Sequence, residues 1–139
     1  RALRLLSGRE HSRAELERKL QSFEEEPGTL AQALDELQAK GFISEQRVIE
    51  SVLHRRAAKL GTARIKQELQ GKGLDPLVVS EALADLKGSE QARAQEVWRK
   101  KFRTQPQDAT ERAKQMRFLA GRGFGGDTIH KVVSGADDE

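Results

Sequence analysis

The sequence contains no cysteine, and this absence excludes several kinds of chemistry at once. Without thiols the chain can form neither disulfide bonds nor a cysteine-ligated zinc site, and it has no thiolate nucleophile. Aromatic residues make up only 4% of the 139 residues, and tyrosine is absent. Because strands favour aromatic and β-branched residues, and no strand-length stretch alternates apolar with polar residues, we expect an all-α protein.

Long apolar segments and clustered catalytic side chains are also missing. No run approaches the length of a membrane span and nothing at the amino end resembles a signal peptide, so we expect a soluble, cytoplasmic protein without a membrane partner. His11, His54 and His130 are too widely spaced for a histidine metal motif. The acidic run at residues 24–26 lies in a polar linker, where nothing raises a carboxyl pKa. We therefore expect no enzyme, no cofactor, no metal and no small-molecule substrate.

Charged residues make up 34% of the sequence, and the two signs are unevenly distributed. Residues 1–43 carry seven lysine and arginine residues against eight acidic ones, whereas residues 44–136 carry eighteen against eleven. A basic middle and carboxyl half suits nucleic acid, or the acidic surface of a protein bound to it. The last three residues are all acidic. We expect residues 136–139 to form a disordered acidic tail.

Helix start and stop signals are dense. Residues 12–15 have the form of a capping box, and residues 29–32 have the same form. Ser44, Asp75 and Asp108 are expected to cap later helices, and Asp127 the last one. Three stops share the pattern of a basic residue, a left-handed glycine and an apolar residue, at residues 40–42, 72–74 and 122–124. These signals predict nine helices.

Two helical segments recur forty-nine residues later, and a fainter third copy follows about fifty residues further on. Each copy has an apolar face, which must be buried against the neighbouring copy. We therefore predict an elongated, curved array of three tandem three-helix repeats, spanning residues 1–43, 44–87 and 88–135. The matching apolar positions of the first and second copies are Ala14, Leu16, Leu20, Leu30, Ala33, Leu34 and Leu37 with Ala63, Ile65, Leu69, Val79, Ala82, Leu83 and Leu86.

Basic side chains are the candidate functional set, because an array of this kind usually presents an extended surface to a large partner. An ordinary solvated surface with scattered ion pairs explains any one of them equally well, whereas the charge asymmetry favours an interaction surface for the basic half as a whole. The candidates are Arg55, Arg56, Lys59, Arg64, Lys66, Arg99, Lys100, Arg103, Arg112, Lys114 and Arg117.

Other motifs have structural explanations. The glycine-rich residues 121–126 are not preceded by a strand or followed by Gly-Lys-Ser/Thr, so we interpret them as a helix stop and a tight turn rather than a phosphate loop. Residues 62–72 resemble the recognition helix of a helix-turn-helix motif, but the repeat explains the same pattern. Trp98 and Met116 occupy apolar helical positions and are expected in the core.

Several short motifs occur in a fixed order along the chain. They are Ala-Leu-Arg-Leu-Leu at 2–6, His-Ser-Arg-Ala-Glu-Leu at 11–16, Gly-Phe-Ile at 41–43, Arg-Arg at 55–56, Arg-Ile at 64–65, Glu-Leu at 68–69, Lys-Gly at 72–73 and Arg-Gly-Phe at 122–124. In their order and spacing they resemble the RecX family, the bacterial regulators of the recombinase RecA, over essentially the whole chain. Where that family often has an acidic residue followed by Phe-Ala, residues 44–49 read Ser-Glu-Gln-Arg-Val-Ile, and we expect Val48 to pack in place of the phenylalanine.

The resemblance implies three tandem three-helix units in a bent protein that binds the RecA filament and the backbone of its single-stranded or double-stranded DNA. It also implies inhibition of filament growth and of ATPase, strand-exchange and co-protease activity. We expect a monomer. Two other functions fit the residues themselves: a plain DNA-binding protein, with tight and salt-dependent binding of naked DNA, and a helical adaptor for an unrelated protein.

Overall fold

The computed structural model describes residues 1–135, in which the regular structure consists of nine α-helices and one short 3₁₀ turn. The predicted all-α fold is confirmed. No helix in this part of the chain is long and apolar enough to cross a membrane. The expected acidic tail lies outside the described residues. The helices are α1 (Ala2–Gly8), α2 (Arg13–Leu20), α3 (Thr29–Ala39), α4 (Glu45–Arg56), α5 (Thr62–Gly71), α6 (Pro76–Lys87), α7 (Glu90–Lys101), α8 (Ala109–Gly121) and α9 (Gly126–Ser134), with the 3₁₀ turn η1 at Gln21–Phe23.

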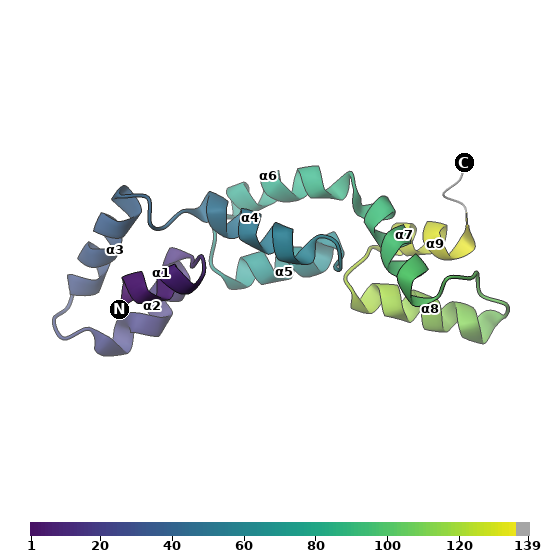
Figure 1. Cartoon of the computed structure of the whole chain (residues 1–139), viewed down its shortest axis with the longest axis horizontal. Coiled ribbons are helices and arrows are strands. Elements are labelled where there is room, and N and C mark those ends of the chain that lie inside the picture. The colour runs from purple at the N-terminus through teal and green to yellow at the C-terminus, as the bar shows by residue number, and fades with distance from the viewer. Residues whose placement is uncertain (136–139) are drawn as a thin grey trace.

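The helices follow one another in three groups along the long axis of the molecule, with α1 and α9 at opposite ends (Figure 1). We call them the first unit (α1–α3), the middle unit (α4–α6) and the third unit (α7–α9). Each unit has its own apolar cluster, centred on Leu16 and Leu34, on Ile65 and Leu69, or on Leu119. The protein therefore has three small cores in series, as the repeat predicts.

Most helix starts follow the local chemistry of the sequence. Ser12 and Glu15 form the predicted capping box, and Ser44 accepts a hydrogen bond from the Arg47 N–H. Asp75 accepts one from the Leu77 N–H, with Pro76 at the first helical position. Val48 is buried with 1% of its surface exposed, as expected for a residue that replaces a larger side chain in the core.

Two predicted caps are wrong. The cap position of α3 is Gly28, whose φ of 92° turns the chain so that the Thr29 hydroxyl donates to the Glu26 carbonyl instead of accepting from the helix. The carboxylate of Glu24 accepts from the Leu30 N–H and takes over the capping role. At α9 the cap position is Gly125, so Asp127 lies inside the first turn, where its charge still favours the helix dipole.

The three predicted helix stops are confirmed. Gly41, Gly73 and Gly123 all have positive φ angles, of 84°, 70° and 93°. In the first and last of these stops the amide of the following phenylalanine donates back to a leucine carbonyl, at 2.9 Å and 3.2 Å. This is the Schellman pattern, which satisfies the carbonyl groups at the end of a helix.

The units are joined by one recurring contact between helix ends. The second helix of each unit begins against the end of the second helix of the following unit. At the first junction the Ser12 hydroxyl donates to the Lys72 carbonyl at 2.5 Å. At the second junction the Gly61 N–H donates to the Arg122 carbonyl at 2.7 Å. Ser12 and Gly61 are equivalent positions in the repeat, and so are Lys72 and Arg122, so the array extends by repetition of one contact.

The second junction brings two backbones into direct contact. A β-carbon at Gly61 would lie 2.3 Å from the Gly123 carbonyl carbon, and one at Gly123 would lie 2.3 Å from Arg64 Cγ. Only glycine permits this approach at either position. The side chain of Arg93 adds hydrogen bonds to the carbonyls of Ala57 (2.9 Å) and Leu60 (2.6 Å), which fix α7 to the end of the middle unit.

We predict that Gly61→Ala lowers the free energy of unfolding by about 3 kcal/mol, because the added methyl group meets backbone that cannot move aside. Urea unfolding followed by circular dichroism measures this loss. Gly121→Ala is the matched control, because no heavy atom lies within 4 Å of its added β-carbon. Equal stability of the two variants would show that the close approach of Gly61 and Gly123 is not a constraint on the fold.

Candidate protein and nucleic-acid interface

The eleven candidate basic residues lie on the middle and third units. Ten of them are exposed, and Arg112 is half-buried. Three lie in or directly after the last turns of α4, two on α5, three in or just after α7 and three on α8. In this order they are Arg55, Arg56 and Lys59; Arg64 and Lys66; Arg99, Lys100 and Arg103; and Arg112, Lys114 and Arg117.

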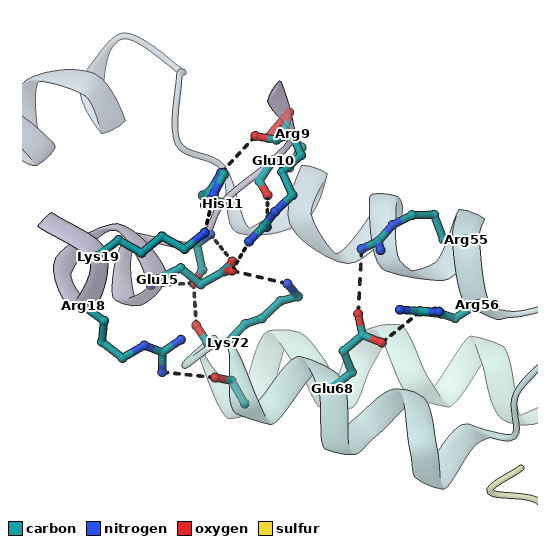
Figure 2. A network of polar contacts seen from close by, with 12 residues as sticks. Arg9, Glu10, His11, Glu15, Arg18, Lys19, Arg55, Arg56, Glu68 and Lys72 are labelled. Carbon is teal, nitrogen blue, oxygen red and sulfur yellow. Dashed lines mark hydrogen bonds and ion pairs between the residues drawn. The ribbon is translucent and has the colours of Figure 1, made fainter. Parts of the chain in front are cut away.

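Arg55 and Arg56 converge on a single acidic residue. Figure 2 shows both guanidinium groups directed from α4 toward Glu68 on α5. The distances to the Glu68 carboxylate oxygens are 3.8 Å and 3.1 Å. One carboxylate neutralises only one of the two charges, so a net positive charge remains at this end of the middle unit. Surface pairs of this kind contribute little stability and can exchange partners.

Two candidates serve the fold itself. Arg64 donates to the Gly121 carbonyl at 2.6 Å across the second junction, and its aliphatic part covers Gly123. Arg112 reaches from α8 to α9, where it contacts the Ser134 hydroxyl at 3.2 Å and His130 Nδ1 at 3.3 Å. Their donor groups already have acceptors within the protein. Both are therefore less available to a partner than the sequence suggests.

The basic residues of α7 are partly paired. Arg99 and Lys100 share Glu96, at 2.5 Å and 4.0 Å, on the exposed surface of the helix. Within residues 1–135 no ion pair forms at Lys59, Lys66, Arg103, Lys114 or Arg117. Lys114 and Arg117 lie three residues apart on α8, so they occupy neighbouring positions on its surface. The available positive charge is concentrated on fewer residues than the candidate list contains.

Arg103 follows α7 with a φ of 69°, the only positive φ at a residue other than glycine in the described chain. Two hydrogen bonds made by a buried glutamine hold the loop that carries Arg103. Trp98 donates through Nε1 to Gln115 at 2.8 Å, and the same glutamine donates to the Thr104 carbonyl at 3.1 Å. Trp98 and Gln115 are buried, with 5% and 0% of their surfaces exposed, so Trp98 belongs to the core as expected. The backbone next to Arg103 is thereby held in place, and Arg103 itself is exposed.

The sequence interpretation missed a charged cluster at the first junction (Figure 2). Glu15 is buried, and it contacts Arg9 at 2.8 Å and Lys72 of the middle unit at 3.5 Å. Its carboxylate also accepts from the Ser12 N–H at 2.9 Å. The capping box in the sequence predicts the hydrogen bond between Ser12 and Glu15. Nothing in the sequence indicates that Lys72 of the middle unit contacts Glu15.

The environment of this cluster shifts two pKa values. Burial by itself raises the pKa of Glu15, but hydrogen bonds from Arg9 and Ser12 and the charge of Lys72 lower it to about 2. His11 is 2% exposed, and its burial lowers its pKa from the ordinary value, assisted by the charges of Arg9 and Lys19. Glu15 is therefore ionised in the folded protein at neutral pH, and the fold favours the neutral form of His11.

Two features of the described residues bear on the binding of small ligands. No group of three histidine or acidic residues in this part of the chain is placed to hold a metal ion. Two hollows in the described surface are open grooves, of about 730 Å³ in the first unit and about 640 Å³ between α5 and α6. None of the three histidines lines either groove.

Comparisons with known proteins cover the whole array. Family models described as the first, second and third three-helix domains of RecX match residues 1–37, 44–83 and 89–133. A protein named Regulatory protein RecX from Leptothrix cholodnii is 49% identical over 139 residues, which is 100% of this chain and 88% of that protein. One of the same name from Ralstonia nicotianae is 46% identical over 137 residues, covering 99% and 86%.

Solved structures support the fold. A crystal structure of RecX from Lactobacillus salivarius superimposes with a TM-score of 0.76 at 22% identity, covering 99% of this chain and 93% of that one. A crystal structure of a regulatory protein RecX superimposes with a TM-score of 0.79 at 19% identity, covering 99% and 70%. The arrangement of three-helix units is thus shared at low sequence identity.

We predict that acid weakens the protein through the first junction. Because the pKa of Glu15 is lowered in the fold, its stabilising contribution is complete above about pH 4.5 and is lost as the pH falls toward 2. The lowered pKa of His11 adds a loss that begins below its ordinary value of 6.5. Glu15→Gln should remove at most about 3 kcal/mol at neutral pH and flatten the profile of unfolding free energy below pH 4.5. The control is Glu17→Gln on the exposed side of α2, and equal profiles for the two variants would contradict the assignment.

We predict that Arg103→Gly raises the free energy of unfolding by up to about 1 kcal/mol, because glycine adopts a positive φ without the steric cost of a β-carbon. Arg103→Ala removes the same side chain but keeps the β-carbon, so it should give no such gain. Urea unfolding of both variants measures the difference. If the alanine variant is as stable as the glycine variant, the backbone at this position is not strained.

Proposed function

The chain belongs to the RecX family of regulatory proteins, and from this membership we propose that it binds the RecA nucleoprotein filament and inhibits filament growth. The proposed consequences are lower ATPase, recombination and co-protease activities, and hence modulation of DNA repair and of the SOS response. The protein acts as a binding regulator in the cytoplasm and not as an enzyme. RecA and the backbone of the bound DNA are its partners.

The shape of the array supports a filamentous partner. Three units in series present a surface that is much longer than it is wide, and α1 and α9 lie at opposite ends of it (Figure 1). An elongated surface can contact several successive subunits of a filament, so affinity comes from many modest contacts that reinforce one another. A compact partner would leave much of this surface without contacts.

The observation that carries the proposal is the set of exposed basic residues without ion pairs in the described chain, on a protein of the RecX family. Lys114 and Arg117 on α8, and Arg103 on its supported loop, extend outward from the third unit. Arginine suits phosphate and carboxylate through its planar fork, and lysine acts as a point charge. These residues therefore suit a surface made of acidic protein groups and DNA phosphates.

The proposed mechanism is steric and electrostatic. An array that occupies the groove of the filament blocks the addition of RecA subunits, or prevents the ordering of ATP-site elements between neighbouring subunits. No chemistry on the chain is required, which agrees with a surface of open grooves. The mechanism also predicts that inhibition needs fewer regulator molecules than RecA subunits, because one bound array affects neighbours on both sides.

The central experiment measures the ATPase of RecA on single-stranded DNA as this protein is added below the RecA concentration. We expect inhibition at substoichiometric protein. Normal ATPase at near-stoichiometric protein would contradict the proposal. Binding of naked DNA, measured over a range of salt concentrations, separates a plain DNA-binding protein from a filament regulator, because the former needs no recombinase. A helical adaptor for an unrelated protein would bind neither.

We predict that reversing Arg103, Lys114 and Arg117 to glutamate reduces inhibition by at least about tenfold while helicity is retained, since each reversal replaces attraction by repulsion. The matched control reverses Arg4, Lys40 and Lys131, which are exposed basic residues outside the candidate set. The two triple variants carry the same change in net charge. Equal inhibition by both would show that the third-unit surface has been misassigned.

A further inference from the structure

In the first unit, one arginine side chain bridges the second and third helices. Arg13 at the start of α2 contacts the Asp35 carboxylate at 2.7 Å on α3. It also donates to the Ala31 carbonyl at 3.2 Å and to the Gln38 side chain at 3.0 Å. A further hydrogen bond to Glu17 holds the guanidinium from its own helix. The arginine therefore bridges α2 and α3.

The third unit repeats this arrangement. Arg112 occupies the position of Arg13 in the repeat, at the start of α8. Its contacts are Ser134, at the position of Asp35, and His130, at the position of Ala31. An arginine thus bridges the second and third helices in both outer units, although the acceptors differ.

The middle unit lacks this bridge. Thr62 stands where the outer units have arginine, and Ala84 stands where the first unit has Asp35. Thr62 is used differently, because its N–H donates to Glu90 at 2.9 Å and its hydroxyl accepts from Arg93 at 3.2 Å. Both partners belong to α7. Thr62 therefore links α5 to α7 at the second junction and does not bridge α5 and α6.

An open groove of about 640 Å³ lies between α5 and α6 in the middle unit. Its apolar lining includes Leu74, Val79 and Leu83, and Lys66 and Lys87 are its charged lining residues. No acidic residue lines it. The two lysines form no ion pair within residues 1–135, and both are exposed. The groove therefore combines an apolar floor with uncompensated positive charge.

We infer that this groove docks an acidic amphipathic segment of the protein partner, with apolar side chains against Leu74 and Leu83 and carboxylates paired with Lys66 and Lys87. The inference rests on the proposed function, because it takes that partner to be the recombinase in its filament. An apolar floor matches side chains of a polypeptide and not a phosphate backbone. No aromatic residue lines the groove, so the stacking by which proteins commonly hold single-stranded bases is absent from it.

The first test uses the absence of cysteine from the natural sequence. Ser80→Cys places a single thiol in the groove for a benzophenone photo-crosslinker, and Ala31→Cys places one at the equivalent position of the first unit. On RecA filaments we expect the Ser80→Cys protein to crosslink to a RecA peptide rich in aspartate, glutamate and large aliphatic residues. Crosslinks to DNA, crosslinks to a basic peptide, or a yield no higher than that of Ala31→Cys would each overturn the inference.

The second test measures affinity for the same filaments. Lys66→Gln combined with Lys87→Gln should weaken binding about tenfold, as expected for the loss of two partly desolvated charge pairs. Lys40→Gln combined with Lys131→Gln removes the same charge elsewhere and should change binding less than about twofold. Circular dichroism confirms that both variants are folded. Equal binding by the two variants overturns the groove assignment.

The outcomes separate the two proposals. If the natural protein inhibits RecA but the groove variants behave as their controls, the groove assignment fails and the proposed function stands. If the natural protein neither binds nor inhibits the filament, both fail. Loss of filament binding in the groove variant, with crosslinks from Ser80→Cys to an acidic peptide, supports both.

Discussion

The architecture depends on one contact, in which the start of a helix in one unit meets the end of the equivalent helix in the next. Backbone carbonyl groups at a helix end have no partner within the helix and must be satisfied by something else. Here the carbonyls of Lys72 and Arg122 accept hydrogen bonds from the preceding unit. Because each three-helix unit is too small to bury a sizeable core, this contact and the apolar faces beside it hold the array together.

The two junctions satisfy the same geometry with different chemistry. The second joins backbone to backbone through glycine, and the charged side chains of Arg93 and Glu90 on α7 add hydrogen bonds to the middle unit. The first surrounds a buried carboxylate with cations from two units, and part of that cluster reaches solvent at Arg9, which is 43% exposed. Burial by itself raises the pKa of Glu90, but hydrogen bonds from Thr62, Gly125 and Thr128 lower it, so acid acts on both junctions.

Local signals in the sequence were sufficient for the fold class, the number of helices and the three glycine stops, because caps and stops depend on a few neighbouring residues. The caps at Thr29 and Asp127 were predicted wrongly because a neighbouring glycine shifted the helix start by one or two residues. The burial of Glu15 and the roles of Arg64 and Arg112 were not predictable, since their partners come from other helices. A count of basic residues marks the charged half of the chain, but it cannot separate side chains that hold the fold from those that face a partner.

The array uses arginine and lysine for different purposes. Arg13, Arg64, Arg93 and Arg112 all reach acceptors on other helices or turns, where a rigid fork of donors can satisfy several oxygen or nitrogen atoms at once. Lysine, a flexible point charge, is left mainly at the surface. The charge available to a partner is therefore smaller than the composition suggests and differs between units. In the middle unit Thr62 stands in place of the bridging arginine and contacts Glu90 and Arg93 of α7, so this position of the repeat links two units there instead of two helices of one unit.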